Sequence, residues 1–149
     1  MKIYYALLVL VLAISPASAQ KSIEGLWKGT MTIGGINSGK EVKFELFLEL
    51  KGKKLKGRSY VHIAPGKVIE MDVKGKMYVD QSLFLHEIEF IPTEDENFQA
   101  PFNRKYQLTY HRSFDSTLKG FWQEIITSPF DEYRERGRIS LKKVDGSKA

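Results

Sequence analysis

The 149-residue sequence contains no cysteine, only two tryptophans and three histidines, and no long apolar run beyond its first residues. Without cysteine the chain has no disulfide, no thiol nucleophile and no site for lipid attachment to an amino-terminal cysteine. It also lacks a Gly-x-Ser-x-Gly elbow, a phosphate-binding glycine loop and a His-Glu-x-x-His motif. These absences favour a non-enzymatic protein without a cofactor.

The amino-terminal residues 1–19 have the composition of a secretory signal. A lysine precedes the apolar run Ile3–Ile14, and small residues follow it up to Ala19. We expect cleavage after Ala19 and export to the periplasm or the cell exterior. The run is short for a stable transmembrane span, although a retained amino-terminal anchor is the alternative. Residues 20–149 then form one domain, which is long enough to bury a core without disulfides.

The rest of the chain alternates apolar and polar residues with the period of two that half-buried β-strands require. In the first such stretch, Ile23–Ile33, Trp27 lies on the apolar face between Gly25 and Gly29. We expect these glycines to make room for a buried indole, which gives all three residues a structural role. Further strands are predicted at 41–50, 55–63, 69–74, 76–80, 83–91, 105–111, 118–127 and 137–144.

Eight or nine consecutive short strands joined by turns predict an all-β, antiparallel up-and-down barrel, with a β-sandwich as the alternative. A short pattern of an apolar residue, a lysine and a glycine recurs at Leu55-Lys56-Gly57, Val73-Lys74-Gly75 and Leu118-Lys119-Gly120. Glycines repeated in this way relieve crowding where strands coil tightly. The recurrence therefore favours the barrel.

Two strands are difficult to assign to an inner and an outer face. For 83–91 we expect Phe84, His86, Ile88 and Phe90 inside, because the other choice would bury Glu87 and Glu89. In 118–127 the aromatic Trp122 shares a face with Glu124, so composition does not fix the register there.

The tripeptide Gly25-Leu26-Trp27 resembles the Gly-x-Trp signature of the calycin superfamily, which includes the lipocalins, fatty-acid-binding proteins and avidins. The later Leu-x-Gly hairpins near Leu55 and Leu118 are similar in order to the avidin layout. The resemblance implies an up-and-down barrel with a ligand site in its mouth. Lipocalins also stack a late basic residue on this tryptophan, whereas alternation places Arg136 and Arg138 outside. Avidins line their site with several tryptophans, so we expect no biotin site.

The candidate ligand-binding residues are aromatic and polar side chains expected near one end of the barrel. They are Trp122, Tyr106, Tyr110, Arg112, His86 and Glu124. Aromatic walls with few polar anchors are typical of ligand pockets, so we expect a small apolar or amphipathic ligand.

A hydrolase-like acid and base pair of His86 and Glu124 is a third, less favoured hypothesis. We expect Glu124 to point outward, which leaves His86 as a core histidine bonded to a tyrosine or glutamate. The three histidines lie on different predicted strands, so no metal site is expected.

The formal net charge of +5 is unevenly distributed along the chain. Five basic residues fall within the eight positions Lys51–Arg58, where they could meet an anionic envelope component or a partner protein. Lysines at a hairpin tip also keep a sheet edge soluble, which explains the cluster without a partner. An envelope interaction through the basic outer surface is thus the alternative to ligand binding, and no nucleic-acid partner is expected.

Overall fold

The computed structural model of the chain describes residues 23–91, 104–125 and 135–145. The expected signal sequence and its cleavage site lie outside these residues. The strands are β1 (Gly25–Thr32), β2 (Glu41–Lys51), β3 (Lys54–Ala64), β4 (Lys67–Met77), β5 (Ser82–Ile91), β6 (Arg104–His111), β7 (Thr117–Glu124) and β8 (Arg136–Lys143). The described part of the chain contains no helix long and apolar enough to span a membrane.

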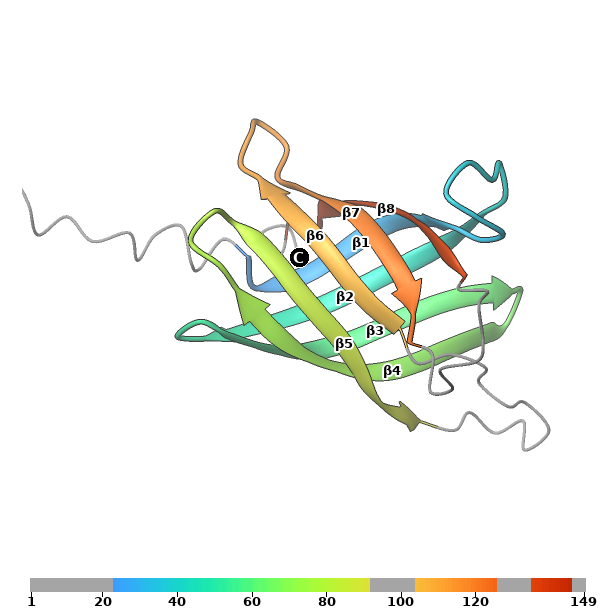
Figure 1. Cartoon of the computed structure of the whole chain (residues 1–149), viewed down its shortest axis with the longest axis horizontal. Helices are drawn as coiled ribbons and strands as arrows, with labels where there is room; N and C mark the ends of the chain where they lie inside the picture. Colours follow the sequence, from blue (N-terminus) through green and yellow to red (C-terminus); the bar gives the residue numbers. More distant parts are fainter. Residues whose placement is uncertain (1–22, 92–103, 126–134, 146–149) are drawn as a thin grey trace, which may run out of the picture.

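Each strand pairs antiparallel with the next, and β8 pairs with β1 to close the barrel (Figure 1). The prediction of an up-and-down barrel is therefore confirmed, and the sandwich alternative is wrong. The separate strand expected at 76–80 is also wrong, because β4 continues without interruption to Met77. The described residues form eight strands.

Alternation of apolar and polar residues places one side of each strand in the barrel interior. The predicted inner faces of β1, β2, β3, β4, β6 and β8 are confirmed. The inward side chains form one continuous core cluster, whose largest fully buried members include Trp27, Trp122, Tyr106, Phe44, Ile23 and Met31. Most of the stability of a disulfide-free chain must come from such a core.

The recurrent glycines lie where neighbouring backbones approach most closely. A Cβ atom added at Gly57, Gly75 or Gly120 would overlap the backbone carbonyl of Phe47, Phe84 or Gln107, respectively, on the adjacent strand. The expectation that these glycines relieve crowding is confirmed. Gly29 has the same role against the Ser140 carbonyl of β8, so it makes room for a backbone rather than for the indole of Trp27. Gly25 instead adopts a left-handed φ of 110°.

Trp27 is buried at the end of the barrel where β1 begins. Its indole N–H donates to the Ile23 carbonyl at 2.9 Å, and the Tyr110 ring meets it edge-on at a centroid distance of 5.9 Å. The Lys143 ammonium lies 5.8 Å from the ring centroid. A late basic side chain is thus stacked on this tryptophan, but it comes from Lys143 and not from Arg136 or Arg138.

The expected assignment of β5 is wrong for residues 83–88. Leu83, Leu85 and Glu87 face inward, whereas Phe84, His86 and Ile88 face outward. The side chains of Glu89 and Phe90 lie outside the described part. The burial of Glu87 is possible because the barrel supplies hydrogen-bond partners for its carboxylate, which the sequence pattern of one strand does not reveal.

Candidate functional site

A polar cluster interrupts the apolar interior near the end of the barrel opposite to Trp27. Glu87 on β5 is 2% exposed and accepts hydrogen bonds from the Tyr106 hydroxyl, from the Arg104 amide at 2.9 Å and from Ser59 Oγ at 3.3 Å. Ser59 also donates to the Met71 carbonyl at 3.5 Å. The carboxylate therefore connects β5 to β3 and β6.

Arg104 supplies a buried cation to the same region, with 3% of its surface exposed. Its guanidinium carbon lies 5.0 Å from the centroid of the Trp122 ring, and Nη1 lies 3.8 Å from Met31 Sδ. The Trp122 indole donates to the Thr32 carbonyl at 2.9 Å. A cation over an indole face in a desolvated setting is a favourable contact.

Burial dominates the protonation behaviour of this cluster. Desolvation raises the pKa of Glu87 above its ordinary value, against the opposing influence of the Arg104 charge and the hydrogen bond from Tyr106. Burial, followed by the negative charge of Glu87, also raises the pKa of Tyr106 well above its ordinary value. Tyr106 therefore remains a neutral hydrogen-bond donor at any physiological pH. The cluster links strands and is enclosed by core side chains.

The structure brings together only some of the candidate ligand residues. Tyr106 and Trp122 are register partners on β6 and β7 and belong to the polar cluster. Tyr110 is at the other end, against Trp27, and Arg112 is exposed just after β6. The candidate set predicted from the sequence therefore combines residues from the two ends of the barrel.

The proposed acid and base pair is not formed. His86 lies on the outer surface between Lys74 and Lys105, its register partners, and burial followed by these two positive charges lowers its pKa. Glu124 stands opposite Arg104 in register, on the face of Trp122, and its carboxylate accepts a hydrogen bond from the Glu135 amide at 3.5 Å. The expectation of an inward His86 and an outward Glu124 is thus wrong for both residues.

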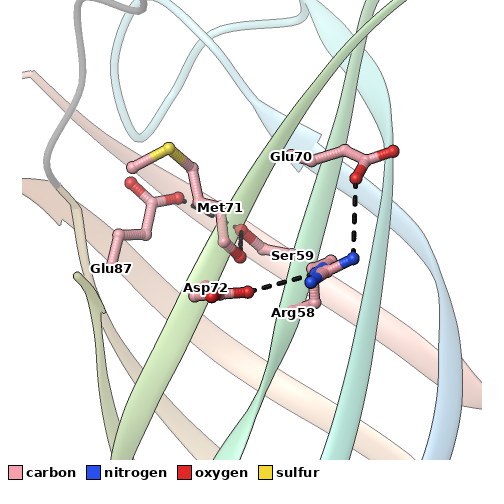
Figure 2. A network of polar contacts seen from close by, with 6 residues as sticks. All are labelled: Arg58, Ser59, Glu70, Met71, Asp72 and Glu87. Atoms are coloured by element: carbon pink, nitrogen blue, oxygen red, sulfur yellow. Dashed lines mark hydrogen bonds and ion pairs between the residues drawn. The ribbon is translucent and has the colours of Figure 1, made fainter. Parts of the chain in front are cut away.

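Charges of both signs lie on the outer surface of β1–β4, and several of them pair: Lys43 with Glu45 at 2.8 Å, and Arg58 with Asp72 at 3.1 Å and Glu70 at 3.8 Å. Figure 2 shows Arg58 reaching Glu70 and Asp72, and Ser59 reaching the Met71 carbonyl and Glu87.

The outward positions of β6, β7 and β8 differ, because none of them is acidic. We call this surface the basic wall. Its basic residues are Lys105, Lys119, Arg136, Arg138 and Lys142. Among the described residues, Lys142 is the one member with an ion pair, to Asp115 at 3.5 Å and largely in solvent. The remaining charges are therefore available to an anion.

A groove of about 720 Å³ lies on the outside of the barrel, across the basic wall and the neighbouring β1. Strand register aligns Gln107, Phe121 and Arg138 in one row and Thr109, Lys119 and Ser140 in the next. In the second row, the short side chains of Thr109 and Ser140 flank the long side chain of Lys119. Thr30 and Thr32 extend the groove over β1, and Glu41 of β2 contributes one acid to its lining.

Phe121 is the most unusual member of the groove. Its ring is 51% exposed on an outward position, beside its register partner Arg138. An exposed ring beside a basic side chain offers a ligand an apolar face next to a site for negative charge. Alternation along β7 makes Phe121 and Trp122 face opposite ways, but the rows of the groove depend on the alignment of β6, β7 and β8, which the closed sheet sets.

The described residues contain no group of three histidine, aspartate or glutamate side chains that could hold a metal ion. Comparison with protein families, with curated proteins and with solved structures gives no match. The function must therefore be inferred from the geometry of the barrel itself.

Proposed function

We propose that the protein is a non-enzymatic binding protein of the cell envelope that holds an anionic glycan on the basic wall. The observation that carries the proposal is the absence of acidic residues from the outward positions of β6–β8, next to a groove of about 720 Å³. The location rests on the secretory composition of residues 1–19.

The groove favours this surface over the Lys51–Arg58 hairpin as the binding site, because it lies on the basic wall. One of the hairpin cations, Arg58, is also already paired with Asp72 and Glu70. Basic side chains gathered on one face attract a polyanion, with an affinity that falls as salt rises. The hydroxyl and amide groups of the groove add hydrogen bonds that neutral sugar positions can use.

The test compares two double variants that remove equal charge. Lys105→Gln with Arg136→Gln removes two cations from the basic wall, and Lys53→Gln with Lys54→Gln removes two from the hairpin. Dextran sulfate is the probe, and neutral dextran is the control with the same backbone. We expect the wall variant to bind dextran sulfate roughly 30-fold more weakly, since each cation near an anionic surface contributes about a factor of five.

The hairpin variant is expected to change the affinity much less, by the reduction in net charge alone. Equal losses of affinity in the two variants would show that dextran sulfate responds to the total charge of the protein and not to a site on the basic wall. Binding of neutral dextran as tightly as dextran sulfate would also contradict the proposal.

A second candidate is a small amphipathic ligand inside the barrel, as in the calycin superfamily. The specific observation in its favour is the buried Glu87 and Arg104 beside Tyr106 and Trp122, an unusual concentration of charge in a core. Such a ligand must displace side chains of the continuous core cluster. The outer groove requires no displacement, so we rank it first.

A further inference from the structure

We propose that the groove is a subsite for a sugar carrying a carboxylate, with Phe121 beneath the sugar ring and Arg138 on the acid group. This inference rests on the proposed function and specifies which chemical unit of the glycan is recognised and by which residues. Recognition of such a sugar requires more than positive charge, because it needs an aromatic ring, a planar cation and hydroxyl groups in fixed relative positions.

The positions of Phe121 and Arg138 fit such a unit. The two residues are register partners on neighbouring strands, so their side chains leave the sheet side by side, about 5 Å apart at the backbone. A pyranose presents an apolar face of C–H groups, which packs on an aromatic ring, while its carboxylate projects from the ring edge. The arginine fork matches the two oxygens of a carboxylate.

The remaining lining supplies groups suited to sugar hydroxyls. Thr109, Ser140 and Thr30 each present a hydroxyl, and Gln107 presents an amide beside Phe121. These side chains both donate and accept hydrogen bonds, as hydroxyl groups of a sugar require. Thr32 is committed elsewhere, since its hydroxyl accepts from the Arg138 amide at 2.7 Å and so fixes β8 against β1 at this point.

The charge of the groove limits how acidic the ligand can be. Lys119 and Arg138 line the groove together with Glu41. A densely sulfated glycan would bring several negative charges close to Glu41, which repels them. A glycan with one carboxylate per sugar can bind that carboxylate to Lys119 or Arg138, while its neutral hydroxyl groups lie near Glu41. The lining therefore favours a uronic acid over a highly sulfated unit.

The test is calorimetric titration of the full mature protein with tetragalacturonate and with its methyl ester, which has the same rings but no charge. We expect the acid to bind at least tenfold more tightly than the ester. Phe121→Ala should weaken tetragalacturonate at least tenfold, and Phe121→Tyr should retain the affinity because it keeps the ring. Phe47→Ala, at a 37% exposed ring on the outer face of β2, is the matched control and should have no effect.

Arg138→Lys separates recognition of the carboxylate from attraction to charge. This variant keeps the positive charge but loses the fork, so tetragalacturonate should bind at least fivefold more weakly while binding of dextran sulfate stays unchanged. If the wild-type protein binds dextran sulfate through the basic wall but does not bind tetragalacturonate, the inference is wrong and the proposed function stands. If neither probe binds, both are wrong. Equal binding of the acid and its ester, or an unaltered Phe121→Ala variant, also overturns the inference.

Discussion

Glu87 is a carboxyl group held in the barrel interior by donors from β3 and β6. Desolvation raises its pKa in the folded protein above the ordinary value of 4.5. The folded state therefore binds this proton more tightly than the unfolded state does. The resulting stabilisation is complete below pH 4.5 and is lost as the pH rises through the raised pKa.

Replacing Glu87 by glutamine tests the direction of this pH dependence, because the amide cannot ionise and its carbonyl can still accept the Tyr106 hydrogen bond. We expect the unfolding free energy of Glu87→Gln, relative to the wild type, to increase as the pH rises above 4.5. Urea unfolding between pH 4 and pH 7 measures this difference. The exposed Glu49→Gln on β2 is the control and should follow the wild type throughout. A relative stability that falls with rising pH would mean that the attraction of Arg104 outweighs the burial.

At the scale of a strand, the recurrent glycines set how closely β3, β4 and β7 approach their neighbours. Gly75 illustrates this, since a Cβ there would overlap the Phe84 carbonyl and lie 2.9 Å from the Leu85 Cα. Backbone atoms cannot move aside without disturbing the pairing of β4 and β5. Closure of the barrel with these inward side chains therefore depends on glycine at this position.

Gly75→Ala is expected to lower the unfolding free energy by about 1–3 kcal/mol or more, as overpacking against backbone does. Gly39→Ala is the matched control, because its added methyl would meet nothing within 4 Å. Chemical denaturation monitored by circular dichroism compares the two. Equal stability of both variants would contradict the role assigned to Gly75.

Local patterns predicted the strands well, and the exceptions have physical causes. Gly75 suggested both a boundary between two strands and a place of close approach; the boundary is wrong, and the close approach is to a carbonyl on β5. The inner face of β5 was misassigned because carboxylates normally face water, whereas Glu87 has donors on two other strands. Tyr106 could be identified as an inward residue, whereas the direction of Trp122 was left open and Arg104 at the start of β6 gave no apolar signal. The groove escaped prediction because its rows depend on the register between strands.

At the scale of the whole molecule, the described residues form one core enclosed by a continuous sheet, with a tryptophan near each end. The Trp27 indole donates a hydrogen bond to Ile23, just before β1 begins, and the Trp122 indole donates one to Thr32, the last residue of β1. Both belong to the same cluster of buried side chains. A closed sheet around a continuous core should unfold in one cooperative transition.

The single-tryptophan variants Trp27→Phe and Trp122→Phe report from opposite ends of the barrel. We expect each to show coincident unfolding transitions by fluorescence and by circular dichroism, since neither end can open while the sheet stays closed. The two variants will differ from each other in overall stability, which does not affect the comparison within each one. A fluorescence transition that precedes the loss of circular dichroism in either variant would reveal an end that opens independently.

The alternation along β6–β8 also has a consequence for protein engineering. Inward positions hold the core, while Gln107, Lys119, Phe121, Arg138 and Ser140 face solvent on three adjacent strands. These five positions can be randomised together without touching a core side chain, provided that Gly120 and Gly137 are kept. Because the sequence has no cysteine, such a library would fold independently of the redox state of its compartment. The barrel is thus a scaffold on which new binding specificities can be selected, in reducing and oxidising surroundings alike.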